Sequence, residues 1–294
     1  MALKVAGSSP VTHPIYNMQL GNFELYPVSD GFFKLDGGAM FGVVPKVLWE
    51  KRMPPDQDNR IQMGLFCLLI KAAGKNILVN TGIGTKYSPR YHEIFRIQHP
   101  PNLIDSLAEH KVKPEDIDFV INTHLHFDHA GNNTKKVGDN AYEPTFPNAR
   151  YVIQKAEWEK ATNPNERTRA SYMQENIRPL MDAKRLDLKD GSGEVMPGVM
   201  VYVTGGHTRG HQIVLIESQG QKAVYWSDLI PTVAHMDLPY IMGYDLFPEE
   251  TLNHKRILLE QAIKERWLCF WEHDPKITCG YIERTEKGLI VKPV

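Results

Sequence analysis

The sequence predicts a single α/β domain in which helices flank packed β-sheets. Three observations support this class: short apolar runs of strand length recur in both halves, two segments carry helix signals, and no linker, repeat or low-complexity tract divides the chain. We expect residues 1–20 to form an N-terminal extension and residues 21–294 to form the domain. A chain of 294 residues is long enough to bury a substantial core in this way.

Short apolar or alternating segments predict the strands, because strands are covered on one or both faces. The turn Ala73-Gly74-Lys75 between two such segments indicates a hairpin. Strands are therefore expected at residues 23–33, 65–71, 76–79, 119–122, 150–154, 199–204, 212–217, 222–226 and 267–271.

Two helices are predicted from the residues at which they begin. Asn102 can cap a helix because its side chain accepts hydrogen bonds from exposed amides, and Asp105 in the first turn favours the same end. A second helix is expected from Pro248 to about residue 265, with proline in the first turn, where its missing N–H costs nothing.

The composition excludes several classes of protein. A formal net charge of −1 gives no global field that would attract nucleic acid or an anionic membrane, although Lys135 and Lys136 allow a small basic patch. Three scattered cysteines are too few for a disulfide framework. No signal peptide and no membrane span is visible, so a cytoplasmic protein is expected.

The residues most indicative of chemistry follow the strand predicted at residues 119–122. His124, His126, Asp128 and His129 place four potential metal ligands within six residues. Imidazole nitrogen and carboxylate oxygen are ligands of zinc and neighbouring borderline metals. A single histidine would be explained by solvation or a backbone hydrogen bond, but three with an aspartate predict a metal site.

The pattern His-x-His-x-Asp-His at residues 124–129, followed by Ala130-Gly131-Asn132, resembles the signature of the metallo-β-lactamase superfamily. Segments similar to the family's later motifs follow in order: Gly206-His207-Thr208-Arg209-Gly210-His211, Trp226-Ser227-Asp228, and His273 after the last predicted strand. The resemblance covers about residues 60–280. It implies the metallo-β-lactamase fold, an αβ/βα four-layer sandwich.

The resemblance also implies two divalent metal ions per chain. The ligands it implies are His124, His126 and His207 for one ion, Asp128, His129 and His273 for the other, and Asp228 as the bridge between them. Two such ions can share a hydroxide nucleophile while one of them polarises the bond under attack. Asp128 would also handle the proton of the leaving group. Zinc is the expected metal, and manganese, iron or cobalt would fit the same nitrogen and oxygen ligands.

Two further residues adjoin these motifs. His211 is expected to support its loop by packing and by hydrogen-bonding the backbone, outside the metal set. Asn80 stands where the family usually has an aspartate whose carboxylate orients a ligand histidine. Asn80 keeps an acceptor oxygen but loses the charge that raises ligand basicity. The site is therefore expected to assemble with an altered metal affinity.

The substrate class follows from comparing branches of the superfamily. Oxygen-reducing diiron members usually carry glutamate in place of His126, and true β-lactamases generally carry cysteine in place of Asp228, so neither activity is expected. Residues 36–46 and the long segment between His129 and His207 resemble the N-acyl-homoserine lactonases, with methyl-parathion-hydrolase-like enzymes as neighbours. The prediction is a hydrolase that opens a lactone ring or cleaves a related ester. Phosphotriester or arylester hydrolysis, and a non-catalytic metal-binding scaffold, are the alternatives.

Substrate contacts are less well defined by the sequence. Some lactonases of this group carry a tyrosine three positions after the bridging aspartate, where this chain has Pro231, so His235 is a candidate substitute donor and catalytic residue. Apolar contacts could come from Met40, Phe41, Trp49 and residues 230–242, although core packing explains most of these side chains. An apolar patch at the site entrance would also suit a homodimer.

Overall fold

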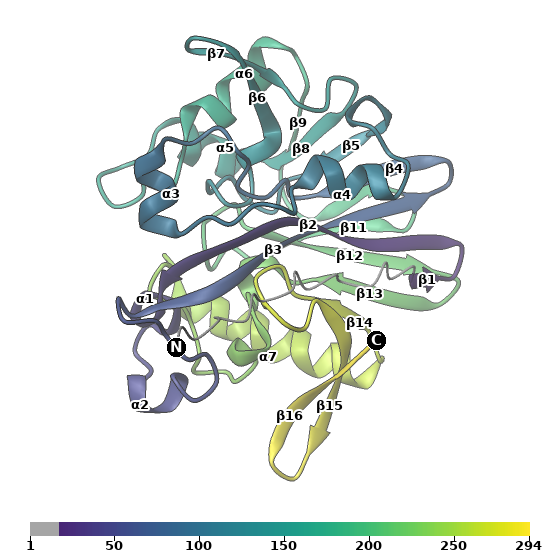
Figure 1. Ribbon diagram of the computed structural model, residues 1–294. Coiled ribbons are helices and arrows are strands. Elements are labelled where there is room, and N and C mark those ends of the chain that lie inside the picture. Colours follow the sequence, from purple (N-terminus) through teal and green to yellow (C-terminus); the bar gives the residue numbers. More distant parts are fainter. Residues whose placement is uncertain (1–17) are drawn as a thin grey trace, which may run out of the picture.

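Two seven-stranded β-sheets form the centre of the computed structural model, which describes residues 18–294 (Figure 1). The strand order of the first sheet is β1 (Met18–Leu20), β2 (Phe23–Asp36), β3 (Arg60–Ala72), β4 (Lys75–Val79), β5 (Phe119–Ile121), β8 (Arg150–Gln154) and β9 (Leu186–Lys189). The order of the second is β10 (Gly193–Met196), β11 (Val199–Val203), β12 (Gln212–Ser218), β13 (Gln221–Tyr225), β14 (Leu268–Phe270), β15 (Cys279–Thr285) and β16 (Gly288–Pro293). A separate hairpin pairs β6 (Thr134–Gly138) with β7 (Ala141–Pro144).

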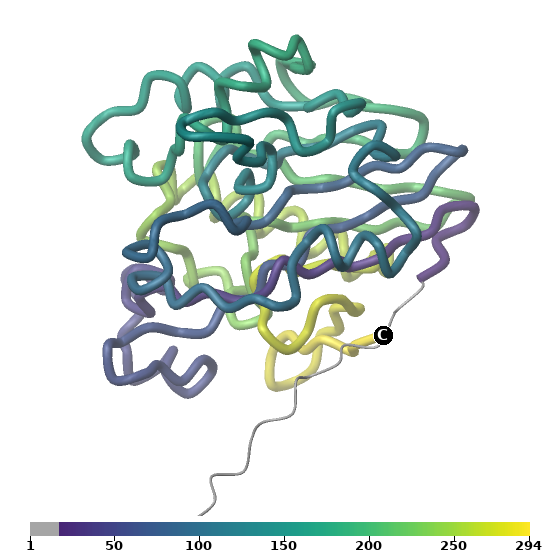
Figure 2. The backbone as a smooth tube through the Cα atoms, turned by 45° about the horizontal axis from the view of Figure 1, so that its top comes forward, coloured from purple at the N-terminus to yellow at the C-terminus, as the bar shows by residue number. Residues whose placement is uncertain are grey.

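Helices cover the outer face of each sheet. Those on the side of the first sheet are α3 (Pro89–Phe95), α4 (Leu103–Glu109), α5 (Lys155–Thr162) and α6 (Arg178–Asp182) (Figure 1). The helix α7 (Pro248–Lys264) lies on the second sheet. The two short helices α1 (Gly37–Phe41) and α2 (Lys46–Trp49) follow β2 in the sequence. Short 3₁₀ helices span Pro114–Asp116, Gly131–Asn133, Gln174–Asn176, Ser227–Leu229 and Val233–His235. The C-terminal hairpin β15–β16, in yellow, lies at the bottom of the molecule in both views (Figure 1 and Figure 2).

Three apolar layers hold the sheets and helices together. Between the sheets, Leu68 and Ile77 of the first sheet share one buried cluster with Val214 and Phe270 of the second. Separate clusters fill the space under α4 and α5 and under α7. Burial of this apolar surface is the main favourable contribution to folding. The predicted four-layer sandwich is confirmed.

Several predicted elements are confirmed closely. The hairpin β3–β4 turns at Ala73 and Gly74, whose φ angles of 48° and 74° are both left-handed. Asn102 caps α4, because its Oδ1 accepts from the backbone amide of Asp105 at 3.0 Å. The helix α7 begins at Pro248, as predicted.

Other elements differ from the predictions. The sequence did not predict β9, β10, β15 and β16, which are short or partly exposed and so lack a strong apolar pattern. Most of the predicted N-terminal extension, residues 1–17, lies outside the described residues. Its last part is wrong, because residues 18–20 form β1 and pair with β2.

The parallel strand pairs bring distant segments to one edge of the sandwich. In the first sheet β4 pairs in parallel with β5, and β5 with β8, whereas in the second sheet β13 pairs in parallel with β14. The carboxyl ends of parallel neighbours lie at the same edge, where ligand sites commonly form in α/β proteins. The loops after β4, β5, β13 and β14 therefore begin close together.

A buried lysine fixes the loop that follows Asp228 in the sequence. Lys255 lies on α7, and its Nζ donates to the carbonyl oxygens of Asp237 at 2.8 Å and Tyr240 at 2.9 Å. Burial lowers the pKa of Lys255 to about 7.

In the described part of the chain, no helix is both long and apolar enough to cross a membrane.

Replacing this lysine should loosen the loop. We expect Lys255→Met to lower the free energy of unfolding by about 2 kcal/mol, because the buried carbonyls lose their donor. Lys264→Met, at an exposed position of the same helix, should change it by less than about 0.5 kcal/mol. Urea denaturation of the two variants measures the difference, and equal stabilities would contradict this role of Lys255.

Candidate metal centre

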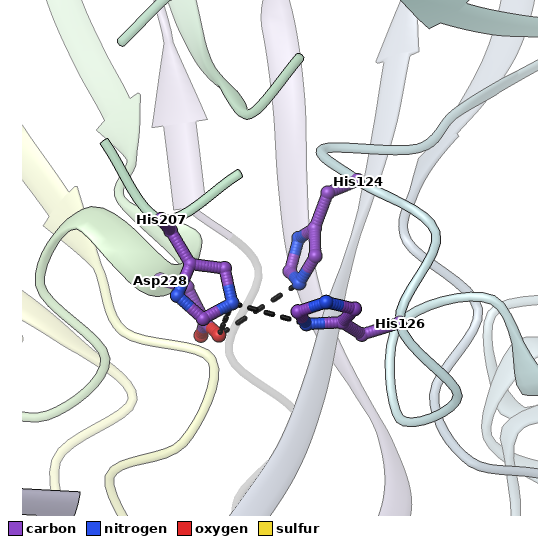
Figure 3. A group of neighbouring side chains, drawn as sticks. All are labelled: His124, His126, His207 and Asp228. Atoms are coloured by element: carbon purple, nitrogen blue, oxygen red, sulfur yellow. Dashed lines mark hydrogen bonds and ion pairs between the residues drawn. The ribbon is translucent and has the colours of Figure 1, made fainter. Parts of the chain in front are cut away.

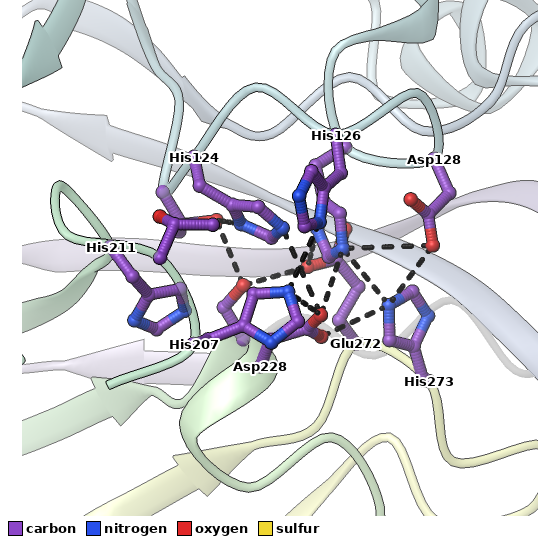
Figure 4. Close-up of polar contacts among 12 residues, drawn as sticks. His124, His126, Asp128, His207, His211, Asp228, Glu272 and His273 are labelled. Carbon is purple, nitrogen blue, oxygen red and sulfur yellow. Dashed lines mark hydrogen bonds and ion pairs between the residues drawn. The ribbon is translucent and has the colours of Figure 1, made fainter. Parts of the chain in front are cut away.

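Seven side chains from four loops converge at the edge where the parallel strands end (Figure 4). They form two groups, and within each group the candidate ligand atoms all lie within 4.8 Å of one another. One group contains His124, His126, His207 and Asp228, and the other contains Asp128, His129 and His273. These are the seven residues that the sequence analysis named as metal ligands.

The loop after β5 is folded tightly so that its side chains diverge toward both groups. The backbone amides of His129 and Ala130 donate to the carbonyl oxygen of His126, and Thr81 N donates to the carbonyl of His129 at 2.8 Å. Gly131 is required beside this turn, because a Cβ there would lie 2.0 Å from the carbonyl oxygen of Ile83. The glycine in the Ala-Gly-Asn sequence thus allows the loop to approach the segment after β4.

In the first group, imidazole nitrogens surround one carboxylate oxygen (Figure 3). Asp228 Oδ2 lies 3.1 Å from His207 Nε2 and 3.8 Å from His124 Nε2. His126 turns its Nδ1 inward, to 3.0 Å from His207 Nε2. Three nitrogens and one carboxylate oxygen, presented from different directions, make up the ligand set of a tetrahedral zinc site.

The second group shares Asp228 with the first. Asp128 Oδ2 lies 3.7 Å from the Nε2 atoms of both His129 and His273, and these two nitrogens are 3.2 Å apart. Asp228 reaches the same two histidines, with Oδ1 3.3 Å from His273 Nε2 and Oδ2 3.5 Å from His129 Nε2. One carboxylate therefore faces both groups.

The outer ring nitrogens of the histidines are held by hydrogen bonds. His207 Nδ1 lies 2.8 Å from Asp245 Oδ1, and His129 Nδ1 lies 2.9 Å from Glu272 Oε2. His273 Nδ1 donates to the carbonyl oxygen of Gly64 at 2.8 Å. Such contacts fix the tautomer of a ligand histidine and point its other nitrogen inward.

Burial sets the charge of the inner side chains. Burial, together with the neighbouring histidines, lowers the pKa of His124 and His126 well below the usual value, so both rings are neutral and keep a lone pair for a metal. Burial would also lower the pKa of His129, but the carboxylates of Glu272, Asp128 and Asp228 raise it well above the usual range. Three buried carboxylates therefore surround this one ring.

These observations fit divalent cations. His124 Nε2 is buried, points into the first group and has no hydrogen-bond partner among residues 18–294. An unsatisfied buried nitrogen costs about 1–3 kcal/mol, which a coordinated ion would offset. The nitrogen and oxygen donor set, with its buried carboxylates, suits a pair of ions.

Asp245 and Glu272 were missed by the sequence analysis, whereas Asn80 was given a role that the structure corrects. Asn80 Oδ1 accepts from the backbone amide of Thr123 at 2.8 Å, so it is not the acceptor for a histidine. Its Nδ2 is the atom that faces His129 Nδ1, at 3.0 Å. The acceptor is Glu272, whose position directly before His273 was the one available signal.

His211 lies beside the centre but in neither group. Its carbonyl oxygen accepts from Thr204 N at 2.9 Å and from Gly205 N at 3.2 Å, and its Nδ1 lies 2.6 Å from Thr204 Oγ1. These are loop-supporting contacts of the kind predicted for this histidine.

His235 does not face a substrate, contrary to the prediction. Its Nε2 donates to the carbonyl oxygen of Met40 at 2.9 Å, and its Nδ1 accepts from Thr232 Oγ1 at 2.7 Å. Burial lowers its pKa to about 3, and its ring stacks on Phe41. Both nitrogens are engaged, so His235 is a core residue. Met40, Phe41 and Trp49 are likewise buried in one apolar cluster, which agrees with core packing.

Comparison with known proteins agrees with this geometry. Residues 64–273 match the sequence model of the Metallo-beta-lactamase superfamily. The chain belongs to the metallo-β-lactamase superfamily. Among superfamily members, an N-acyl homoserine lactonase from Bacillus cereus is 30% identical over 249 residues, which cover 80% of this chain and 88% of that protein.

Two solved structures share the fold of this chain. A probable metal-dependent hydrolase from Staphylococcus aureus aligns with a TM-score of 0.86 and 32% identity, over 94% of this chain and 99% of its own. AidC, a dizinc quorum-quenching lactonase, aligns with a TM-score of 0.77 and 22% identity, over 95% of this chain and 97% of its own. The chain is thus a superfamily hydrolase related to the N-acyl homoserine lactonases.

Metal removal should lower the thermal stability of the protein. An ion that binds only the folded state, at a free concentration 1,000 times its Kd, adds about 4 kcal/mol to the free energy of unfolding. The melting temperature of zinc-loaded protein should therefore exceed that of chelator-treated protein by roughly 10 °C. Calorimetry of both forms checks this, with magnesium as a control because it prefers all-oxygen ligands. Identical melting temperatures would contradict a metal centre.

Proposed function

We propose that this protein is a dinuclear metal-dependent hydrolase that opens the ring of N-acyl-homoserine lactones or cleaves a closely related ester. The main support is that Asp228 faces both ligand groups, because a site for a single ion has no need of a shared carboxylate. The substrate class is supported by the relative from Bacillus cereus, which covers most of the chain.

The residues that would hold the ions are His124, His126 and His207 for one, Asp128, His129 and His273 for the other, and Asp228 between them. Bound ions would act as Lewis acids that polarise the substrate carbonyl and make a coordinated water acidic near neutral pH. Zinc suits the donor set best, and manganese, iron and cobalt are compatible with it.

The protein itself contributes orientation and a proton carrier. The contacts of Asp245 to His207 and of Gly64 to His273 hold the ligands before substrate arrives, so little reorganisation is needed during reaction. Asp128 Oδ2 faces the two histidines of its group, and its other oxygen points away from them (Figure 4). Burial raises the pKa of Asp128, which favours a proton there. We assign Oδ1 as the atom that passes a proton to the departing alkoxide.

Tyr244 is our candidate for the donor that Pro231 and His235 cannot provide. It precedes Asp245, the residue that holds His207, and its side chain is 38% exposed and so accessible to a ligand. Burial, followed by the charges of Asp36, Asp128 and Asp228, raises its pKa to about 12. The hydroxyl therefore keeps its proton at neutral pH, as a donor must.

The predicted homodimer stays a prediction. Val43, Val47 and Leu48, between α1 and α2 or on α2, are all at least half exposed. Apolar side chains grouped in this way would suit such a contact.

Metal-reconstituted protein should open N-hexanoyl-homoserine lactone, and chelation should abolish the activity reversibly. An aryl phosphotriester should be a poorer substrate by kcat/KM, and Asp228→Ala should lose activity toward both. A pH-stat assay of ring opening measures the first reaction, and release of the phenol measures the second. Preference for the phosphotriester would contradict the substrate class, and silence of the loaded enzyme toward both would favour a non-catalytic scaffold.

Tyr244→Phe should lower kcat for the lactone at least about tenfold, because a donor to the reacting oxygen is lost. Its metal content should equal that of the unmodified protein, since the hydroxyl is not a ligand. Tyr281→Phe, on β15 away from the centre, is the matched control and should leave kcat unchanged. Unaltered kcat in Tyr244→Phe would exclude Tyr244 as the donor.

A further inference from the structure

Glu272 and Asn80 reach the same ring nitrogen of His129 from opposite sheets. Glu272 follows β14 and is fully buried, with its Oε2 2.9 Å from His129 Nδ1. Asn80 follows β4, is equally buried, and places its Nδ2 3.0 Å from the same nitrogen. The two side chains also contact each other, because Asn80 Nδ2 donates to Glu272 Oε2 at 2.7 Å.

This arrangement decides which nitrogen of His129 carries the proton. An ionised carboxylate can only accept, so Glu272 requires a hydrogen on Nδ1, and in the neutral ring the lone pair then lies on Nε2, which faces Asp128 and Asp228. The amide of Asn80 is a competing donor that would favour the opposite tautomer, in which Nε2 is protonated and cannot bind a metal. Because Glu272 accepts from Asn80 as well, it removes that competition.

Glu272 also differs from Asn80 in charge. Among residues 18–294, Glu272 is the one carboxylate within hydrogen-bond distance of the outer nitrogen of His129, and it joins the carboxylates of Asp128 and Asp228 around this ring. A carboxylate behind a ligand imidazole raises the basicity of the ligand. The position of Asn80 could carry this charge equally well, since its amide nitrogen lies at nearly the same distance from Nδ1.

We propose that Glu272 is the positioning residue for His129, and that Asn80 and Glu272 form a matched pair that supplies one negative charge to this histidine. The inference rests on the proposed metal centre. It follows that the charge can be moved between the two positions. Asn80 has a φ of 58°, a left-handed conformation that aspartate also tolerates, so the backbone permits the exchange.

The test compares Glu272→Gln, Asn80→Asp and the double variant Asn80→Asp/Glu272→Gln by competitive chelator titration of zinc. Glu272→Gln should weaken one of the two zinc sites about 10- to 100-fold. Asn80→Asp should also weaken binding, because two carboxylates would then share one buried contact. The double variant restores a single charge and should recover the affinity to within about threefold. Glu194→Gln, an exposed position on β10, is the control for the substitution itself.

A second readout reports on the ligand rather than on affinity. The visible spectrum of cobalt-substituted protein should change in Glu272→Gln and return in the double variant. A double variant that folds when Glu272→Gln does not would also support the proposal. The proposal would be overturned if Glu272→Gln kept the zinc affinity and the cobalt spectrum of the unmodified protein. It would also be overturned if the double variant bound zinc no more tightly than Glu272→Gln, or did not fold. Failure of the unmodified protein to bind zinc would instead overturn the proposed function.

Discussion

The structure depends on the burial of charged and polar side chains that satisfy one another only in part, since His124 Nε2 and Asp228 Oδ1 have no hydrogen-bond partner among residues 18–294. At one edge of the sandwich, five imidazole rings and two carboxylates point inward, with Asp228 between the two groups. Burying charged side chains without compensation costs several kcal/mol for each charged group. Nitrogens only 3.0–3.2 Å apart, as between His126 and His207 or His129 and His273, place lone pairs where a cation would satisfy them. The proposed chemistry follows from the same need for positive charge.

The fold makes this burial possible by supplying rigid supports. Parallel pairing brings the ends of β4 and β5 together in one sheet and those of β13 and β14 together in the other, and the apolar layer between the sheets holds the two ends face to face. Each ligand loop starts at a strand end, so its position follows from backbone hydrogen bonds. Outer contacts then set the rotation of individual rings, as Asp245 does for His207. Precision at the centre is thus provided by residues that would touch neither metal nor substrate.

The sequence predicted the inner side chains well and their supports poorly. His124 to His129 could be recognised because their spacing is local, and His207, Asp228 and His273 because each follows an apolar strand in a fixed order. Asn80 and Glu272 are 192 residues apart, and no local pattern indicates that they share a hydrogen bond. His235 was misassigned because a histidine in a loop gives no sign of whether its ring faces solvent or, as here, the core. Weakly apolar strands such as β9 and β16 were missed because they are stabilised mainly by pairing at sheet edges.

Anomalous diffraction at the zinc absorption edge, from crystals of zinc-loaded protein, would show whether the two ligand groups each hold a metal ion. We expect two peaks, one bounded by His124, His126 and His207 and the other by Asp128, His129 and His273, with Asp228 between them. A single peak, or ions bound away from these seven side chains, would contradict it.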